Sequence, residues 1–365
     1  MNEEDQTRRE KNSSGMSTEH CKGCELCRLG AKMVLFVTGV CYGACFYCPL
    51  SARRRGKDAV YANERLVQCA ADVIEKARST DALGTGITGG EPLLKLARVV
   101  HYIKLLKSEF GLEHHVHLYS SLAPSERTLA ALAAVGLDEI RLHPPIDEWG
   151  VFSSSQHYAA LKRAKALSLD AGIEIPAIKP VPAIVEALEE LGGSLNLHEL
   201  EFSETNYRAM IARGFIPRES DYGARGSREM AEQIAAGVPL AYFCSSASKD
   251  GIQLRERLKR KARRAARPFQ EVTEDGTLVY GILESDSSFG SLTSLSSEEY
   301  AFVDGALLTS WQLALDLVLN QPALADKARI VETYPDGMVV EVTPLSDHLK
   351  PKTSIRGANL QWFRM

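Results

Sequence analysis

The residues with the clearest capacity for chemistry are three cysteines, Cys41, Cys45 and Cys48, which form the pattern Cys-x3-Cys-x2-Cys. Thiols at this spacing can pair as disulfides, hold a structural zinc ion, or bind an iron–sulfur cluster that keeps one iron free. A structural zinc site is closed by four ligands, whereas this segment supplies three thiols. Three thiols alone therefore argue against a closed zinc site, and the surrounding sequence has to decide among the alternatives.

Composition argues against the disulfide alternative. Eight cysteines in a chain of 365 residues are too few for a disulfide scaffold. The sequence has no apolar run long enough for a transmembrane helix, and residues 1–19 have no apolar signal-peptide core. We therefore expect a cytoplasmic protein with reduced thiols and a disordered polar tail over residues 1–19. The net charge of −4 points to no particular class of partner.

The elements that must position these thiols alternate between strands and helices. The residue patterns predict strands at 32–40, 82–90, 114–120, 138–145, 173–180 and 197–204, and helices at 63–77, 93–110, 125–135, 156–172 and 185–192. Such alternation predicts an α/β fold with a parallel sheet, either open or barrel-like. The three cysteines follow the first strand, and the sequence Gly89-Gly90-Glu91-Pro92 follows the second. Both segments therefore belong at the C-terminal edge of the sheet, where the loops of a barrel converge.

These two motifs resemble those of the radical S-adenosylmethionine (SAM) superfamily, in which an aromatic residue, here Tyr47, precedes the last cysteine. The resemblance implies a partial (β/α)6 barrel over residues 32–205 and a [4Fe–4S] cluster on the three cysteines. It implies reductive cleavage of SAM to a 5′-deoxyadenosyl radical that abstracts hydrogen from a substrate. It also implies that Tyr47 lies beside the adenine, and that the backbone of Gly89, Gly90 and Glu91 meets the amino group of the methionine. Packing in the core is the alternative role for Tyr47.

Longer segments narrow this resemblance. CFYCPLS (45–51), ITGGEPL (87–93) and GLDEIRLHP (136–144) look like an archaeal group of radical SAM proteins related to pyruvate formate-lyase activating enzymes. The resemblance covers roughly residues 20–285. It implies an enzyme that modifies a protein or peptide and receives electrons from a donor such as a ferredoxin or flavodoxin. Two alternatives stay open: modification of tRNA or a nucleotide-derived metabolite by the same chemistry, and a non-enzymatic iron–sulfur electron-transfer protein.

A second group of thiols precedes the first strand, in the spacing Cys-x2-Cys-x2-Cys. Its members are Cys21, Cys24 and Cys27. The spacing predicts an auxiliary metal-binding segment over residues 20–31, which holds either a second [4Fe–4S] cluster or zinc. We expect Cys244, in a polar loop after the barrel, to be its fourth ligand, with His20 as the alternative. Cys69 is expected to pack into the core from its helix.

Polar side chains near the ends of the later strands are candidates for contacts with SAM. They are Arg141 and Lys179 for the methionine carboxylate, Glu201 and Asn206 for the ribose, and His143 as a proton donor. An equally weighted alternative is a satisfied polar network that closes the end of the sheet. A separate group, His114, His115 and His117, is interpreted as structural or substrate-facing rather than as a metal site, because the sequence shows no further ligand for it.

The sequence changes character after the predicted sheet. Residues 206–270 are expected to cap the mouth of the barrel and include a basic helix at 255–267 with eight Arg or Lys residues and one Glu. A solvated helix face is one interpretation of these charges, and contact with RNA or phosphate is the other. Residues 271–365 predict a small α+β appendage with hairpin turns at 275–276 and 335–337.

Overall fold

The computed structural model describes residues 21–236, 238, 240–284, 296 and 298–349. The predicted tail at 1–19 and the candidate ligand His20 lie outside these residues. The chain divides into two compact units, here called the N-terminal unit, up to Arg257, and the C-terminal unit, from Leu258 onward. This boundary falls within helix α10 (Leu254–Ala265), whereas the sequence placed the start of the appendage at residue 271.

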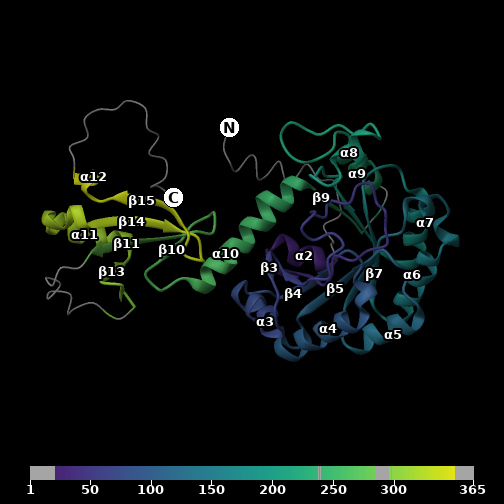
Figure 1. Cartoon of the computed structure of the whole chain (residues 1–365), viewed down its shortest axis with the longest axis horizontal. Coiled ribbons are helices and arrows are strands. Elements are labelled where there is room, and N and C mark those ends of the chain that lie inside the picture. The colour runs from purple at the N-terminus through teal and green to yellow at the C-terminus, as the bar shows by residue number, and fades with distance from the viewer. Residues whose placement is uncertain (1–20, 237, 239, 285–295, 297, 350–365) are drawn as a thin grey trace. The chain divides into compact units, whose positions relative to one another are not determined.

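A nine-stranded sheet organises the N-terminal unit, in the order β3-β2-β1-β4-β5-β6-β7-β8-β9 (Figure 1). Two short strands, β2 (Tyr61–Ala62) and β3 (Arg65–Leu66), form an antiparallel edge. The remaining strands are parallel and follow chain order: β1 (Lys32–Phe36), β4 (Gly84–Thr88), β5 (His115–Ser120), β6 (Glu139–Leu142), β7 (Asp170–Pro176), β8 (Ser194–His198) and β9 (Ala241–Cys244). The prediction of an α/β fold with a parallel sheet is confirmed, and β9 extends the sheet beyond the six predicted strands.

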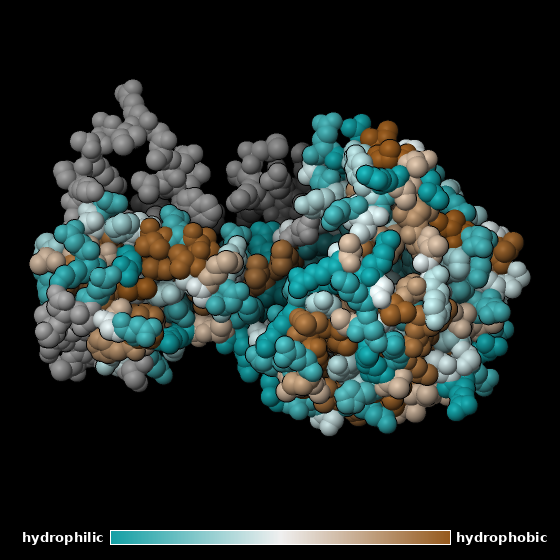
Figure 2. Space-filling view, in the orientation of Figure 1, coloured by the Kyte–Doolittle hydropathy of each residue, from teal (hydrophilic) through white to brown (hydrophobic). Residues whose placement is uncertain are grey.

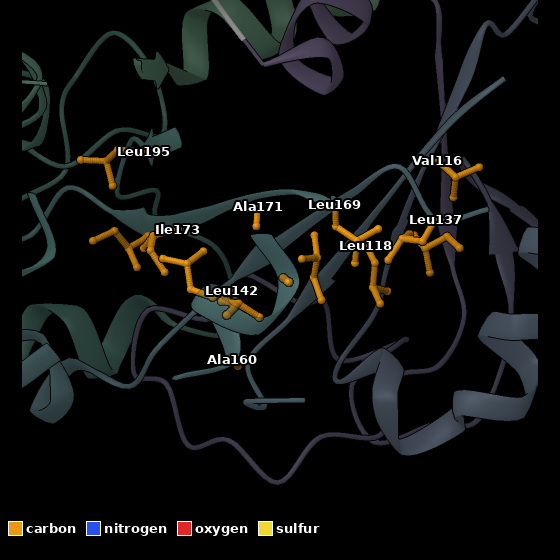
Figure 3. Packing of buried hydrophobic residues seen from close by; sticks show 14 of the residues in the cluster. Val116, Leu118, Leu137, Leu142, Ala160, Leu169, Ala171, Ile173 and Leu195 are labelled. Carbon is orange, nitrogen blue, oxygen red and sulfur yellow. The ribbon is translucent and has the colours of Figure 1, made fainter. Parts of the chain in front are cut away.

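Five helices cover one face of this sheet. They are α3 (Ala70–Ser79), α4 (Leu96–Phe110), α5 (Glu126–Ala134), α6 (Gln156–Ala166) and α7 (Pro182–Leu191). Every second strand residue, such as Leu118, Leu142 and Ile173, is fully buried in one hydrophobic cluster with these helices (Figure 3). Each such side chain contributes roughly 1.5–3 kcal/mol when it is buried, so this layer holds the sheet in place.

The opposite face of the sheet, here called the polar face, carries the alternate residues. Its side chains include Lys32, His115, His117, Glu139, Arg141, Glu174 and Asn196. Helix α2 (Lys22–Arg28) lies against this face, on the other side of the sheet from α3 to α7 (Figure 1). The backbone N–H of Gly23 donates to the Glu139 carboxylate at 3.1 Å, and a Cβ on Gly84 would lie 2.8 Å from Leu26 Cδ1. The N-terminal cysteines are therefore brought onto the polar face by α2.

One predicted helix is shorter than its sequence pattern suggested. The helix expected at 156–172 ends at Ala166, and residues 170–176 form β7 instead. A Cβ on Gly172 would lie 2.5 Å from the carbonyl oxygen of Ser194. This glycine therefore permits close pairing of β7 with β8 and does not terminate the helix.

The prediction for Cys69 was also wrong. The helix expected at 63–77 begins only at Ala70, after the short strand β3, and Cys69 is its N-cap. The thiol is exposed, and the Cys69 N–H donates to Asp72 Oδ2 at 3.0 Å. Cys69 starts the helix and does not pack into the core.

Shorter helical segments complete the N-terminal unit. They are η1 (Pro92–Lys95), η2 (Ile146–Ser154), α8 (Tyr207–Ile211), α9 (Ser227–Ala235) and η3 (Ser248–Gln253). Across the residues that the structure describes, no helix is both long and apolar enough to cross a membrane.

The C-terminal unit is built on an antiparallel sheet of order β12-β13-β11-β14-β15, with β10 paired to β11. Its elements are β10 (Glu271–Val272), β11 (Leu278–Glu284), β12 (Tyr300–Val303), β13 (Ala306–Thr309), α11 (Trp311–Asn320), η4 (Pro322–Lys327), β14 (Ala328–Thr333), β15 (Val339–Pro344) and α12 (Ser346–Leu349). Both predicted hairpins are confirmed, and Gly276 and Gly337 take the left-handed backbone conformation in their turns, with φ of 78° and 89°. Figure 2 shows hydrophobic patches on this unit, whose edge strand β15 exposes Val339, Val340 and Val342.

Candidate functional site

The loop after β1 and the loop after β4 contact each other through their backbones. The N–H of Gly90 donates to the Thr38 carbonyl at 2.7 Å, and the N–H of Glu91 donates to the Val40 carbonyl at 2.8 Å. A Cβ on Gly89 would lie 2.5 Å from Thr38 O, and one on Gly90 would lie 2.5 Å from Val40 O. Only glycine permits this approach. A protonated amino group only donates hydrogen bonds, so one bound here would be met by the carbonyl groups.

The three cysteines of the first motif lie on the loop after β1, here called the cysteine loop (residues 38–50). Cys41 is exposed, and Cys45 and Cys48 are partly buried. The N–H of Gly43 donates to Cys41 Sγ at 3.2 Å, although burial raises the pKa of this thiol. A Cβ on Gly43 would lie 3.3 Å from Cys41 Sγ and 3.7 Å from Cys45 Sγ, so both sulfurs lie beside Gly43. Three thiols on one loop, with Cys41 exposed, fit a [4Fe–4S] cluster with one free iron.

Tyr47 lies in a small hydrophobic cluster that includes Leu200 and Phe202. Its hydroxyl lies 2.7 Å from His143 Nε2, and His143 Nδ1 lies 2.7 Å from the carbonyl oxygen of Glu174. Because a carbonyl only accepts, Nδ1 carries the proton and Nε2 accepts from Tyr47. Burial lowers the pKa of His143 to about 4, so the ring is neutral near pH 7. These contacts favour the packing role of Tyr47 and do not support His143 as a proton donor.

Asn206 ties the cysteine loop to the segment after β8. Its side-chain amide is buried, and Nδ2 donates to the carbonyls of Tyr47 at 3.0 Å and Glu201 at 2.9 Å. Its Oδ1 accepts the backbone N–H of Ser203 at 2.7 Å. With all three interactions made inside the protein, the contacts support a positioning role for Asn206 rather than a contact with ribose.

Replacing Asn206 with alanine is expected to lower the free energy of unfolding of the N-terminal unit by about 1–3 kcal/mol, because the Tyr47 carbonyl loses its buried donor. Asn206→Asp should cost at least as much, since it places a carboxylate against two carbonyl oxygens. Urea unfolding of the metal-free protein measures both variants. Gln68→Ala, at an exposed amide of the same unit, serves as the control and should change stability by less than about 0.5 kcal/mol. Equal midpoints for Asn206→Ala and the control would contradict the positioning role.

Glu91 is 1% exposed, and its carboxylate is fully engaged. It accepts hydrogen bonds from Leu93 N at 2.9 Å, Ser120 Oγ at 2.9 Å, Ser121 N at 2.7 Å, Ser121 Oγ at 2.6 Å and Leu122 N at 3.2 Å. The side chain therefore fixes the loop after β5 to the loop after β4 and does not itself meet a ligand.

A pocket of about 620 Å³ borders the end of the cysteine loop at Pro49. Its walls include two tyrosines and three carboxylates, namely Tyr207, Tyr222, Glu201, Glu204 and Asp221. Lys249 also lines the pocket and pairs with Glu201 at 2.7 Å. The predicted ribose ligand Glu201 is thus part of this pocket wall, with its charge already compensated.

The N-terminal cysteines are held by groups of the polar face. Cys24 is 4% exposed, and its Sγ lies 3.0 Å from Asn196 Oδ1, while Cys21 Sγ lies 3.6 Å from the same atom. Arg141 Nη2 donates to Cys21 Sγ at 3.1 Å. The hydrogen bond between the two thiols lowers the pKa of Cys21 and raises that of Cys24. These side chains are therefore close neighbours, although Asn196 and Arg141 lie far from them in sequence.

Cys244 lies at the end of strand β9, whereas the sequence placed it in a polar loop. It pairs in register with His198 of β8 and accepts from Gln253 Nε2 at 3.4 Å. Burial raises the pKa of Cys244 to about 11, and the neighbouring thiol of Cys27 adds to this rise. The pKa of Tyr242 is raised by burial and then by the thiols of Cys244, Cys24 and Cys27. The structure thus gathers Cys244 with the N-terminal cysteines, from the opposite end of the sheet in chain order.

The two residues predicted to bind the methionine carboxylate, Arg141 and Lys179, make their contacts outside the cysteine loop. Arg141 is buried between Glu139, at 2.5 Å, and Glu174, at 2.8 Å, and also reaches the N-terminal cysteines. Lys179 is exposed and donates to the Ile146 carbonyl at 3.3 Å. These contacts place Arg141 in the surroundings of the N-terminal cysteines and give neither residue a link to the first motif.

Two histidines on the polar face, His115 and His117, lie close to the Glu139 carboxylate, which the sequence analysis did not connect with them. The ligand atoms of His115, His117 and Glu139 lie within 4.8 Å of one another, and all three residues are buried. Lys32 Nζ, however, lies against His117 Nδ1, and Arg141 lies against Glu139. A metal ion here would meet two like charges at short range. The contacts therefore support the structural interpretation of His115 and His117.

Much of the charge on the basic helix is paired. Three of its cations have acidic partners: Glu64 lies 3.5 Å from Arg257, Glu274 lies 2.5 Å from Lys259 and Asp336 lies 3.7 Å from Lys261. These pairs favour a structural or solvated role for the helix over a nucleic-acid surface.

Four functional residues were absent from the sequence-based candidates: Lys32, Glu139, Glu174 and Asn196. Glu174 and Asn196 are each flanked by buried apolar residues within a strand, as Asn196 is by Leu195 and Leu197, whereas Lys32 and Glu139 are the first residues of their strands. This alternation with period two was the available signal, because it places such residues together on the face opposite the core.

Similar proteins are known for most of the chain. A family model described as a domain of unknown function (DUF8061) matches residues 276–345, within the C-terminal unit. A Methanocaldococcus jannaschii protein named "Putative glycyl-radical enzyme activating enzyme MJ0021" is 36% identical over 351 residues, which cover 89% of this chain and 92% of that protein. The crystal structure of methylornithine synthase (PylB) has a TM-score of 0.38 and 14% identity, over 63% of this chain and 79% of that one. A structural likeness at this level is too weak to assign a function.

Proposed function

This chain belongs to the radical SAM family of its Methanocaldococcus jannaschii relative, and from this membership we propose that it binds a [4Fe–4S] cluster at Cys41, Cys45 and Cys48 and cleaves SAM reductively. The chain is an enzyme of that family. When bound, the cluster supplies the electron for this cleavage, which yields a 5′-deoxyadenosyl radical and methionine. The radical would then take a hydrogen atom from a substrate.

One observation carries this proposal, the direct backbone contact between the cysteine loop and the loop of Gly89, Gly90 and Glu91. A SAM molecule whose amino group meets the carbonyls of the second loop would stand beside the thiols of the first. The two glycines make this contact possible, because a side chain at either position would collide with the Thr38 or Val40 carbonyl. Glu91 keeps this arrangement rigid through its contacts with the loop after β5. The sequential order of the parallel strands supports a partial barrel around this site.

For the substrate, we propose a protein or peptide, in keeping with the activating enzyme named for the relative. The pocket beside Pro49 supports this proposal, because its tyrosines and carboxylates suit a polypeptide segment better than a polyanion. Modification of tRNA has less support, since the basic helix has acidic partners for Arg257, Lys259 and Lys261. The electron would come from a ferredoxin or flavodoxin.

Reductive cleavage of SAM provides the test. The full chain is reconstituted anaerobically with iron and sulfide, reduced with dithionite and mixed with SAM, and 5′-deoxyadenosine and methionine are quantified by liquid chromatography. We expect both products in equal amounts, even without substrate, from the parent and from Cys69→Ala, which removes a thiol outside both sites. A protein that carries the cluster of the cysteine loop but forms no 5′-deoxyadenosine would refute the proposal.

A further inference from the structure

Four thiols converge on the polar face of the sheet from two distant parts of the chain. Cys24 and Cys27 lie on α2, Cys21 precedes it, and Cys244 ends β9. The register places Cys244 beside His198, two residues beyond Asn196 on the neighbouring strand β8. Asn196 in turn lies within reach of the Cys21 and Cys24 sulfurs. One part of the polar face, where Cys24 is buried and the other three cysteines are partly buried, therefore offers four thiolate ligands, the number that closes a metal site.

The environment of the Asn196 side chain indicates that the sulfurs in this region are thiolates. Asn196 is 3% exposed, and its Oδ1 faces two thiols while its buried Nδ2 has no hydrogen-bond partner. The oxygen and nitrogen of an amide exchange places when the group rotates by 180°. Against thiolates the reverse orientation is preferred, because Nδ2 then donates N–H···S bonds and the unpartnered donor is satisfied.

Two buried cations could balance the negative charge of metal-bound thiolates at this site. Arg141 donates to Cys21 Sγ, and Lys32 donates to the carbonyl of Gly23 on α2 at 2.9 Å. Both cations are buried, and a buried charge is stable only when it has partners of opposite sign. Glu139 and Glu174 provide part of this compensation, and four metal-bound thiolates would provide more.

The distances between the cysteine sulfurs do not match those of a four-thiolate zinc site. Tetrahedral zinc with bonds of about 2.3 Å draws its four sulfurs to roughly 3.8 Å from one another. Within the described part of the chain, the group of three potential ligand atoms within 4.8 Å of one another is His115, His117 and Glu139, so no three cysteine sulfurs approach that closely. A [4Fe–4S] cluster binds each thiolate at a different iron and does not require three sulfurs this close together.

We propose that Cys21, Cys24, Cys27 and Cys244 hold a second [4Fe–4S] cluster on the polar face of the sheet, with Asn196 and Arg141 donating hydrogen bonds to its sulfur ligands. The site is separate from the cysteine loop and does not depend on SAM cleavage at that loop. Its closed set of four thiolates leaves no iron open to SAM, which assigns it to structure or electron transfer.

The experiment uses the full chain with Cys41, Cys45 and Cys48 replaced by alanine, so that iron at the cysteine loop is absent. After anaerobic reconstitution we expect about four irons and four sulfides per chain. Adding Cys244→Ser should remove most of this iron, whereas adding Cys69→Ala should remove none. Circular dichroism and thermal unfolding confirm that each variant is folded before its metal content is compared. One zinc per chain, no bound metal, or full iron content in the Cys244→Ser protein would each overturn the proposal.

The hydrogen bond assigned to Asn196 can be tested separately through the reduction potential of the cluster. Asn196→Leu keeps the approximate volume but removes the donor, and hydrogen bonds to cluster sulfurs raise the reduction potential. We expect Asn196→Leu to keep its iron and to show a more negative midpoint potential in an EPR-monitored titration of the same triple-alanine background. Asn196→Gln, which retains an amide, should shift the potential less. Equal potentials in Asn196→Leu and the background protein would overturn the hydrogen bond assigned to Asn196.

Discussion

Replacing Cys41, Cys45 and Cys48 together with alanine is expected to reduce SAM cleavage to background and to remove about four irons per chain, one cluster's worth. The physical reason is that the cofactor carries the difficult electron transfer, and no other group on the cysteine loop can replace it. The iron held by the N-terminal cysteines should remain, because those thiols lie on the polar face and are bound by other partners. Iron analysis and quantification of 5′-deoxyadenosine measure the two effects separately.

The matched control for this experiment is Cys69→Ala, which removes an exposed thiol at the start of α3. It should retain both the full iron content and full SAM cleavage. A triple-alanine protein that still produced 5′-deoxyadenosine would show that the cluster responsible lies elsewhere. A triple-alanine protein that lost all of its iron would instead show that the two cysteine groups share one site.

The second large effect is expected for Glu91→Ala. Five hydrogen bonds converge on this buried carboxylate, and removal of the carboxylate leaves their buried or part-buried donors without this acceptor. Each unsatisfied donor costs about 1–3 kcal/mol, so we expect the free energy of unfolding to fall by at least about 3 kcal/mol. SAM cleavage should fall as well, because the loop of Gly89 and Gly90 loses its anchor.

Glu91→Gln tests the charge alone. The amide keeps one oxygen acceptor but turns a nitrogen toward existing donors, so its stability should lie between those of the parent and Glu91→Ala. Glu113→Ala, at an exposed position of the same unit, should change stability by less than about 0.5 kcal/mol. Chemical denaturation of the metal-free proteins provides the comparison. A Glu91→Ala protein as stable as Glu113→Ala would contradict the anchoring role.

These two experiments distinguish residues that bind the cluster from residues that stabilise the loops around it. Loss of the cysteines should abolish the reaction without removing the hydrogen bonds of Glu91, whereas loss of Glu91 should weaken the site while all three thiols remain. Metal-free stability distinguishes them, because the Glu91 variant breaks five buried or part-buried hydrogen bonds, whereas the cysteine variant breaks the exposed hydrogen bond from Gly43 to Cys41.

Local spacing in the sequence determined much of this protein. The cysteine loop, the glycine motif after the second strand and the alternation of strands with helices were all visible as patterns within a few tens of residues. Such patterns report backbone periodicity and the reach of neighbouring side chains, which depend little on the rest of the chain. The parallel sheet and both hairpins of the C-terminal unit follow from the same local rules.

Only the tertiary structure decided which distant residues meet. Arg141 was predicted to bind the SAM carboxylate because it lies near the end of a strand. The strand register and the position of α2 instead place it in contact with Cys21, 120 residues away in the sequence. Cys244 joined the sheet as part of a strand that its polar sequence did not predict, and Cys69 turned outward because its helix began later than its pattern suggested. A period of two tells which residues share a face, but the element that covers this face is chosen by packing across the whole unit. The sequence thus predicted the cysteine loop and the chemistry proposed for it, and tertiary packing decided the surroundings of the N-terminal cysteines.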